Sequence, residues 1–150
     1  LCIAGKGPDE GRYRELTRRL GIENSVEFLG PLPDDLLKKY LASCDLCVFP
    51  SAYEGFGIAI LEAMAAEKAV ITSHRGGQTD FAMDGENACL VDVERPGCLE
   101  RAIGMLLDDA AERERLARNA RVTAEEYDWE RIVPMYIDLY GRMTGERGAG

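Results

Sequence analysis

Two glutamates, Glu54 and Glu62, stand eight positions apart in a glycine-rich stretch and have the spacing that most suggests chemistry in this chain. Glu54 lies in a predicted loop after an apolar run, and Glu62 lies inside a helix predicted over residues 57–66. At 1.5 Å per residue, Glu62 is roughly 7.5 Å further along the axis than the helix start. Two carboxylates at that separation could hold two different parts of one extended ligand.

The backbone between the two glutamates is suited to an anion. Unpaired N–H groups at a helix start, together with the helix dipole, favour negative charge there. Gly55 and Gly57 let a ligand approach the main chain closely. The residues alone leave a second interpretation equally open, in which Glu54 is a solvated loop acid and Glu62 is a charge on the helix surface.

The elements that position these residues follow from the alternation of short apolar runs with amphipathic stretches, which is typical of βα units on a parallel sheet. Strands are predicted over residues 1–4, 26–29, 46–49, 69–71 and 88–91, and only helices follow Pro96. We therefore expect an α/β fold, a Rossmann-like parallel sheet with flanking helices and a helical C-terminus. Ligands of such sheets bind at the carboxyl ends of the strands, so the candidate loops cover residues 5–8, 30–34, 51–57 and 73–80.

Composition excludes several classes of partner. The 150 residues include 18 basic and 27 acidic side chains, for a formal net charge of −9. Nucleic-acid binding needs a basic stripe that releases counterions, and an anionic membrane surface would also repel this chain. No apolar run approaches the ~20 residues of a membrane span, and no signal peptide is recognisable, so we expect a cytoplasmic protein without a membrane segment.

Length and hydrophobic content favour one domain. With 46% hydrophobic residues, a chain of this size can bury one complete core. We expect the domain to span residues 1–141. The remaining residues, 142–150, have nothing to bury and are expected to form a frayed tail. Trp129 opens the last predicted helix, where we expect it to pack.

The five cysteines are an odd number without a secretory signal, which favours reduced thiols over a disulfide framework. Cys44 and Cys47 have the spacing of a metal or redox pair. A zinc site would need further ligands, however, and the chain has no second cysteine pair and only one histidine, His74. We interpret both cysteines as core residues.

Other features allow a functional and a simpler interpretation. Gly5 and Gly7 match part of a dinucleotide fingerprint, but the acid expected after the next strand is missing, which favours a tight turn. Lys6, His74 and Arg75 lie in strand-end loops and could neutralise a diphosphate, although such side chains are more often only solvated. A glycosidase acid pair would face across an open cleft, which argues against that role for two glutamates along one loop and helix.

In the stretch around Glu54 and Glu62, the chain resembles the retaining glycosyltransferases of the GT-B fold, in the group called glycosyl transferases group 1 or family 4. The resemblance rests on an E-x7-E motif with its usual neighbours, Glu54-Gly55-Phe56-Gly57 and Leu61-Glu62-Ala63-Met64-Ala65. Supporting segments follow the family's order and cover nearly the whole chain: residues 5–8, 26–30, 45–51, 76–77, 84–87 and 129–130.

The resemblance implies a C-terminal domain that binds a nucleoside-diphosphate sugar as donor substrate. In the family, the glutamate at the position of Glu54 contacts the donor sugar and is the expected catalytic residue, and the one at Glu62 holds the ribose hydroxyls. The segment that flanks the base corresponds to Gly30 and Leu32. No cofactor or metal is implied, because cationic side chains neutralise the leaving diphosphate. Backbone amides that approach the sugar and phosphates belong to Gly55, Phe56, Gly57 and Ile58.

The chain also departs from the family. The strand and helix that carry an Arg and a Lys for the diphosphate would precede Leu1, as would the N-terminal acceptor-binding domain. We therefore expect a fragment that is inactive alone and whose missing strand is central in the family's sheet. Thr79 and Asp80 stand where the family has Pro-Glu, and residues 67–69 replace a Gly-x-Pro turn.

Two functions are compatible with the sequence. The first is the donor-binding domain of a hexosyltransferase-like enzyme, with the donor and the parent's acceptor-binding domain as partners and no nucleic acid. In this family the acceptor domain often brings the parent to the inner face of the membrane. The alternative is a stand-alone nucleotide-binding or interaction module that has lost catalysis.

Overall fold

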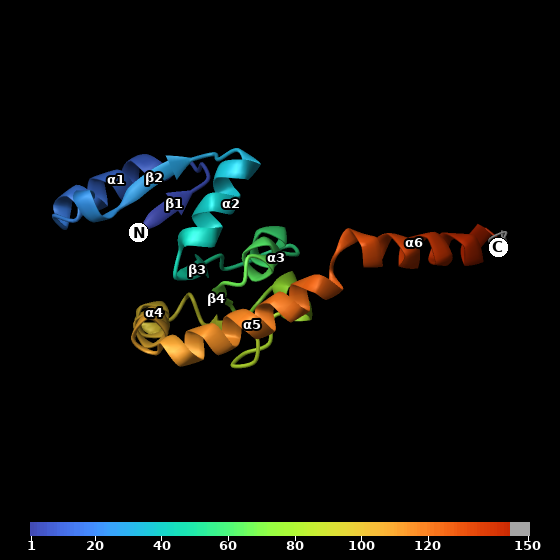
Figure 1. Ribbon diagram of the computed structural model, residues 1–150. Coiled ribbons are helices and arrows are strands. Elements are labelled where there is room, and N and C mark those ends of the chain that lie inside the picture. The colour runs from blue at the N-terminus through green and yellow to red at the C-terminus, as the bar shows by residue number, and fades with distance from the viewer. Residues whose placement is uncertain (145–150) are drawn as a thin grey trace. The chain divides into compact units, whose positions relative to one another are not determined.

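The structure is a computed structural model that describes residues 1–144, and the chain divides into two compact units at Tyr40 and Leu41. Each unit contains a parallel sheet flanked by helices (Figure 1). The predicted α/β class, the Rossmann-like pattern of parallel strands and the helical C-terminus are confirmed. The single expected sheet is instead two, because among residues 1–144 the first two strands pair only with each other.

The first unit is built around a two-stranded sheet. Strand β1 lies parallel to β2, with Ile3 opposite Phe28. Gly21 follows the first helix at φ +67°, a left-handed conformation that ends helices and favours glycine. The elements are β1 (Cys2–Ala4), α1 (Glu10–Arg19), the 3-10 helix η1 (Glu23–Ser25), β2 (Glu27–Gly30) and α2 (Asp34–Ser43), which continues into the second unit.

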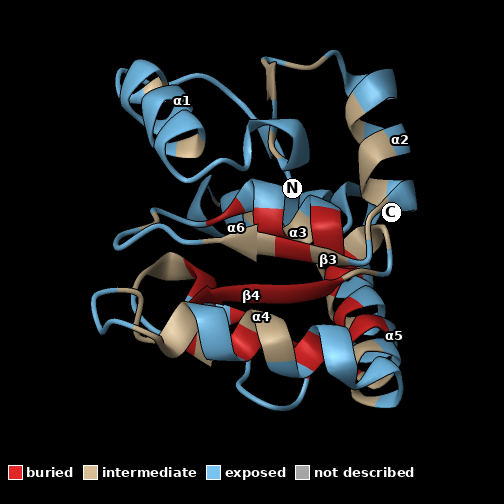
Figure 2. Ribbon diagram, turned by 90° about the vertical axis from the view of Figure 1, so that its left-hand side faces the viewer, coloured by how far each residue is buried: buried red, intermediate tan, exposed pale blue. Residues whose placement is uncertain are grey.

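The second unit contains a three-stranded sheet in the order β3-β4-β5, and its middle strand is buried along its whole length (Figure 2). The strand predicted over residues 69–71 extends to Ser73. Thr72 can continue it because its hydroxyl donates to the Phe49 carbonyl at 3.3 Å, which satisfies a buried polar group. The strands are β3 (Leu46–Phe49), β4 (Ala69–Ser73) and β5 (Cys89–Val91).

Helices cover both faces of this sheet, as the continuous apolar runs predict. Val70 belongs to one core cluster with Ile60 and Met64, whereas the next residue, Ile71, belongs to a second cluster with Leu106. Successive side chains of a strand point to opposite faces, so one strand supports two cores. The helices are α3 (Ile58–Ala65), the 3-10 helix η2 (Gly77–Asp80), α4 (Cys98–Asp108), α5 (Ala110–Glu126) and α6 (Trp129–Thr144).

Asn87 is a buried polar residue that joins the loop before β5 to helix α5. Its Nδ2 donates to the Phe81 carbonyl and to the Thr123 hydroxyl, both at 2.8 Å, and its Oδ1 accepts from the Met83 amide at 2.7 Å. Asn87→Ala should lower the free energy of unfolding by about 1–3 kcal/mol, because it leaves buried polar groups unpaired. Urea unfolding measures this, with Asn119→Ala, which removes one exposed hydrogen bond to the Glu86 carbonyl, as the control; equal losses would contradict the assignment.

Asp109 caps helix α5 at its junction with α4. Its side chain accepts from the Glu112 amide at 2.9 Å, the hydrogen bond favoured by an aspartate with a glutamate three residues later. Glu112 in turn accepts two hydrogen bonds of 2.7 Å from Arg115. These hydrogen bonds lower the pKa of Glu112 below its ordinary value of 4.5, against an opposing effect of desolvation.

This ion pair predicts a pH-dependent contribution to stability. The pKa of Glu112 is lower in the folded than in the unfolded chain, so its contribution is complete above pH 4.5 and is lost as the pH falls through the folded value. Glu112→Gln should therefore destabilise the protein at neutral pH, and its difference from the wild type should shrink in acid. Urea unfolding of both proteins at neutral and at acidic pH measures the difference in their free energies of unfolding. A difference that stays constant with pH would contradict the prediction.

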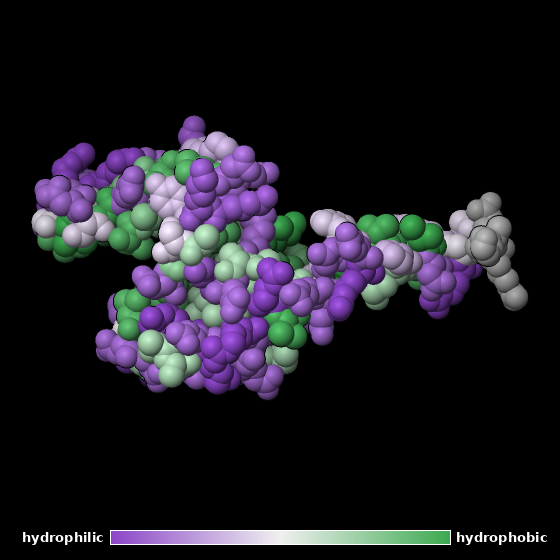
Figure 3. Space-filling view, viewed as in Figure 1, coloured by the Kyte–Doolittle hydropathy of each residue, from purple (hydrophilic) through white to green (hydrophobic). Residues whose placement is uncertain are grey.

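Helix α6 has no buried residue, and hydrophobic atoms lie on its surface (Figure 3). Trp129 is 73% exposed, so the prediction that it packs is wrong for the chain described here. Its helix is apolar at Val133, Tyr136, Ile137 and Tyr140, and these side chains are also exposed, because within residues 1–144 nothing covers them. The helix runs to Thr144, three residues beyond the expected domain end at 141. The rest of the expected tail, 145–150, lies outside the described residues.

No helix within residues 1–144 combines the length and the hydrophobicity required to cross a membrane.

Candidate functional site

The candidate site lies in the second unit, where the loop after β3 leads into α3. Glu54 is half-buried in this loop, and Glu62 is exposed on α3, as the sequence predicts. Both follow the carboxyl end of β3, the position at which parallel sheets bind ligands. The loop and the helix therefore present two carboxylates from one continuous segment.

The start of α3 has no side-chain cap. Gly57 occupies the N-cap with φ +94°, a left-handed conformation that glycine adopts without strain, and it supplies no capping side chain. A β-carbon there would also lie 2.9 Å from the Ile60 side chain. The amides of Ile58 and Ala59 are therefore not capped by a side chain and suit an anion, whereas the Ile60 amide donates to the Gly57 carbonyl at 2.9 Å.

A glycine pair supports the loop from the end of β4. The Gly77 amide donates to the Glu54 carbonyl at 2.9 Å. A β-carbon at Gly77 would lie 1.9 Å from the Gly55 carbonyl oxygen, and one at Gly76 would lie 2.8 Å from the Glu54 carbonyl oxygen. The loop that carries Glu54 can rest this closely on the pair only because both residues lack a side chain.

Gln78 is a structural residue of the site that the sequence does not reveal. Its side chain is fully buried, and its Nε2 donates to the carbonyls of Ser73 at 2.8 Å and Arg75 at 2.7 Å. Gln78 thereby fixes the turn that presents Gly76 and Gly77 to the loop. No periodic pattern marks a buried glutamine; the preceding glycine pair is the one local signal.

Phe56 uses its side chain for packing. Its ring lies 5.5 Å from that of Phe81 and 6.1 Å from that of Tyr127, both in tilted or edge arrangements. Such contacts stabilise aromatic clusters. The side chain of Phe56 is therefore used for packing, and the role expected for its amide stays a prediction.

The three residues expected to neutralise a diphosphate, Lys6, His74 and Arg75, differ in their hydrogen-bond partners. Arg75 donates through Nε to His74 Nε2 at 3.2 Å and forms an exposed ion pair with Glu94 at 2.8 Å. His74 Nδ1 lies 3.0 Å from the Val91 carbonyl, which can only accept, so this geometry requires a neutral imidazole protonated at Nδ1. Lys6 is exposed in the first unit. Their contact with a diphosphate stays a prediction.

Gly30 and Leu32 belong to the first unit. Gly30 ends β2 at φ +64°, and its carbonyl accepts from the Gly5 amide at 2.8 Å, so the two strand-end turns of that unit lie together. Leu32 is half-buried just beyond β2. Gly30 is therefore the last residue of the strand rather than the first of the loop, whereas Leu32 lies in the strand-end loop that the sequence predicts.

Comparison with known proteins identifies the family. The family model described as Glycosyl transferases group 1 matches residues 1–123. The chain belongs to this family, as the motif around Glu54 and Glu62 predicts.

Two curated relatives illustrate the relationship. A glycosyltransferase of Methanocaldococcus jannaschii is 36% identical over 141 residues, which cover 93% of this chain and 36% of that protein. The D-inositol 3-phosphate glycosyltransferase of Salinispora tropica is 37% identical over 132 residues, which cover 88% of this chain and 27% of that protein. The chain thus spans roughly a third of the length of the curated relatives that it matches.

Solved structures support the fold. The sucrose-phosphate synthase of Thermosynechococcus elongatus matches with a TM-score of 0.87 and 29% identity, over 98% of this chain and 39% of that one. HepE of Anabaena, in complex with UDP-glucose, matches with a TM-score of 0.79 and 27% identity, over 96% of this chain and 40% of that one. Both are glycosyltransferases of the GT-B fold, which confirms the expected fold.

Proposed function

We propose that this chain is the donor-binding part of a retaining glycosyltransferase, which transfers a hexose from a nucleoside diphosphate to an acceptor. The observation that carries the proposal is the loop with Glu54, held by Gly76 and Gly77, which leads directly to the start of α3, where no side chain caps the helix, and to Glu62. The complex of HepE with UDP-glucose supports a donor of this chemical class.

Each part of the segment suits one part of such a donor. The Glu62 carboxylate accepts hydrogen bonds from the ribose hydroxyls, and the Glu54 carboxylate contacts the sugar. Amides at Gly57 and Ile58 face the phosphates, where the helix dipole favours negative charge. Gly55 and Phe56 add backbone amides for the sugar, and by the family resemblance Gly30 and Leu32 are proposed to flank the base.

Transfer breaks the bond between the sugar and the diphosphate, and negative charge develops on the diphosphate as it leaves. In the proposed reaction this charge is stabilised by amides and cationic side chains, without a metal or cofactor. Lys6 and Arg75 are the cationic candidates within this chain, because the hydrogen bonds of His74 require a neutral ring. We propose that the acceptor-binding domain of a longer parent is the partner, and that this chain alone does not catalyse because the acceptor site lies in that domain.

Calorimetric titration tests the binding step. The folded chain is titrated with UDP, GDP and ADP, and then with their sugars, after circular dichroism has confirmed its secondary structure. We expect one nucleotide to bind better than the others and its sugar conjugate to bind as well. If none of them binds a folded sample, the donor-site assignment is wrong. Binding that persists without transfer after the acceptor domain is added favours the noncatalytic module.

A further inference from the structure

Two thiols outside the candidate site lie in contact. The sulfur atoms of Cys44 and Cys47 are 3.5 Å apart, and Cys44 also donates to the Leu41 carbonyl at 3.3 Å. Because a carbonyl can only accept, Cys44 uses its hydrogen there, and Cys47 donates to the Cys44 sulfur. The two side chains therefore already point toward one another in the folded chain.

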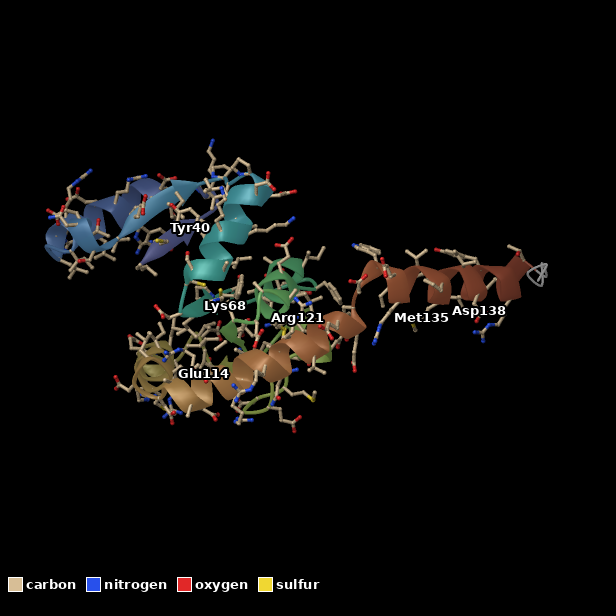
Figure 4. All side chains as sticks on the ribbon, in the orientation of Figure 1. Tyr40, Lys68, Glu114, Arg121, Met135 and Asp138 are labelled. Carbon is tan, nitrogen blue, oxygen red and sulfur yellow. The ribbon has the colours of Figure 1, made fainter. Side chains whose placement is uncertain are left out.

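The two thiols differ in their access to solvent. Cys44 is half-buried just after the last turn of α2, whereas Cys47 lies in β3 and is 8% exposed. Burial, and secondarily the neighbouring Cys44, raises the pKa of Cys47 to about 12, against an opposing effect of Lys68. Lys68, labelled in Figure 4, also donates to the Ala42 carbonyl at 2.8 Å and thereby holds the end of α2.

We propose that Cys44 and Cys47 form a modification site, at which reaction with a low-molecular-weight disulfide closes a reversible intramolecular disulfide bond. Bonded sulfur atoms lie about 2.05 Å apart, so the two side chains need to close only a short distance. In the reduced state both residues fill the core, as the sequence predicts. Their contact also permits oxidation to a disulfide.

Exchange with glutathione disulfide balances without any further reactant. The Cys44 thiolate attacks one sulfur of glutathione disulfide, forms a mixed disulfide and releases one glutathione thiolate. Cys47 then loses its proton, attacks the Cys44 sulfur and releases the second glutathione. Both protons lost by the protein end on the two released glutathione thiols. The protein is oxidised by two electrons, and the reagent disulfide is reduced.

The site is independent of the proposed function. Cys44 and Cys47 flank the start of β3, whereas Glu54 follows the end of that strand. The disulfide would join the end of α2 to β3, and no step of the donor chemistry uses either sulfur. Failure of the thiol experiment consequently leaves the donor-site proposal untouched, and the reverse also holds.

Peptide mapping of the full chain tests the proposal. Trypsin cleaves after Lys39 and Lys68, so one peptide contains both thiols and no other cysteine. The protein is incubated with glutathione disulfide, unfolded in denaturant, alkylated with iodoacetamide and digested. We expect this peptide to lose two hydrogen atoms and both alkylation sites, and to regain both sites after treatment with dithiothreitol. Exposed Cys2 reports that the reagent reacts, because it should carry glutathione.

Single variants test the order of the steps. Cys47→Ser should stop the reaction at the mixed disulfide, so glutathione remains on Cys44. Cys44→Ser should leave Cys47 unmodified, and Cys89→Ser is the control that should still form the bond. If the wild-type peptide keeps two free thiols while Cys2 is modified, the proposal is overturned. A disulfide from Cys44 or Cys47 to any other cysteine also overturns it.

Discussion

Replacing Gly77 by alanine is expected to lower the free energy of unfolding by more than about 4 kcal/mol. Losses of this size result from severe disruption of buried regions. The added β-carbon would lie 1.9 Å from the Gly55 carbonyl oxygen and 2.8 Å from the Gly55 carbonyl carbon. Both are main-chain atoms, so no change of rotamer relieves the overlap. The loop that carries Glu54 must move away, and the hydrogen bond from the Gly77 amide to the Glu54 carbonyl is lost with it.

Urea unfolding followed by circular dichroism measures this loss. Gly104→Ala, inside α4, is the matched control, because a β-carbon there meets nothing within 4 Å. Alanine is the better helix former, so the control should gain about 0.5–1 kcal/mol. If the two variants unfold at the same urea concentration, the loop does not rest on the glycine pair as described.

Much of the second unit's fold could be predicted because its signals are local. The apolar run over residues 46–49 gives β3 without error, and the spacing of Ile58 and Leu61 places α3 within one residue at each end. The sequence pair Asp109 and Glu112 marks a helix start, and the structure contains that cap. Periodicity and capping depend on neighbours in sequence, which a single chain displays directly.

The errors concern partners that are distant in sequence. Thr72 extends β4 beyond the predicted end because it reaches the Phe49 carbonyl. Asn87, on whose burial the sequence makes no prediction, is buried because Thr123, 36 residues away, helps to satisfy it. The division of the strands between two sheets also depends on long-range pairing. Trp129 was expected to pack because large aromatic side chains are usually covered, but helical spacing alone does not reveal whether a covering surface exists.

The candidate site also contains some residues that the sequence predicts and others that it does not. The glycine pair and the spacing of the two glutamates are visible in sequence, and the structure places Gly76 and Gly77 against the loop that carries Glu54. Gln78 could not be predicted, since its role depends on the two carbonyls toward which the turn directs it. The spacing of the candidate ligand-facing residues is thus visible in the sequence, whereas the residues that hold the backbone behind them depend on contacts that the sequence does not display.

Glu62→Ala is expected to weaken nucleotide binding by about 1.5–3 kcal/mol, because the variant removes charge-assisted hydrogen bonds to the ribose. That loss corresponds to a rise in Kd of roughly 10- to 150-fold. Glu62 is exposed on α3, and alanine favours helices, so the fold should be unaffected. Calorimetry with the best-binding nucleotide measures the change, and Glu100→Ala in the first turn of α4 is the matched control.

Glu54→Ala separates the sugar contact from the nucleoside contact. The half-buried Glu54 carboxylate is proposed to touch only the sugar, so this variant should bind the plain nucleotide as the wild type does and its sugar conjugate more weakly. Equal losses for both ligands would mean that Glu54 acts through the loop or through the phosphates. Unchanged binding of the nucleotide by Glu62→Ala would place the ribose elsewhere. The two glutamates together therefore report whether the donor lies along the loop and helix in the proposed direction.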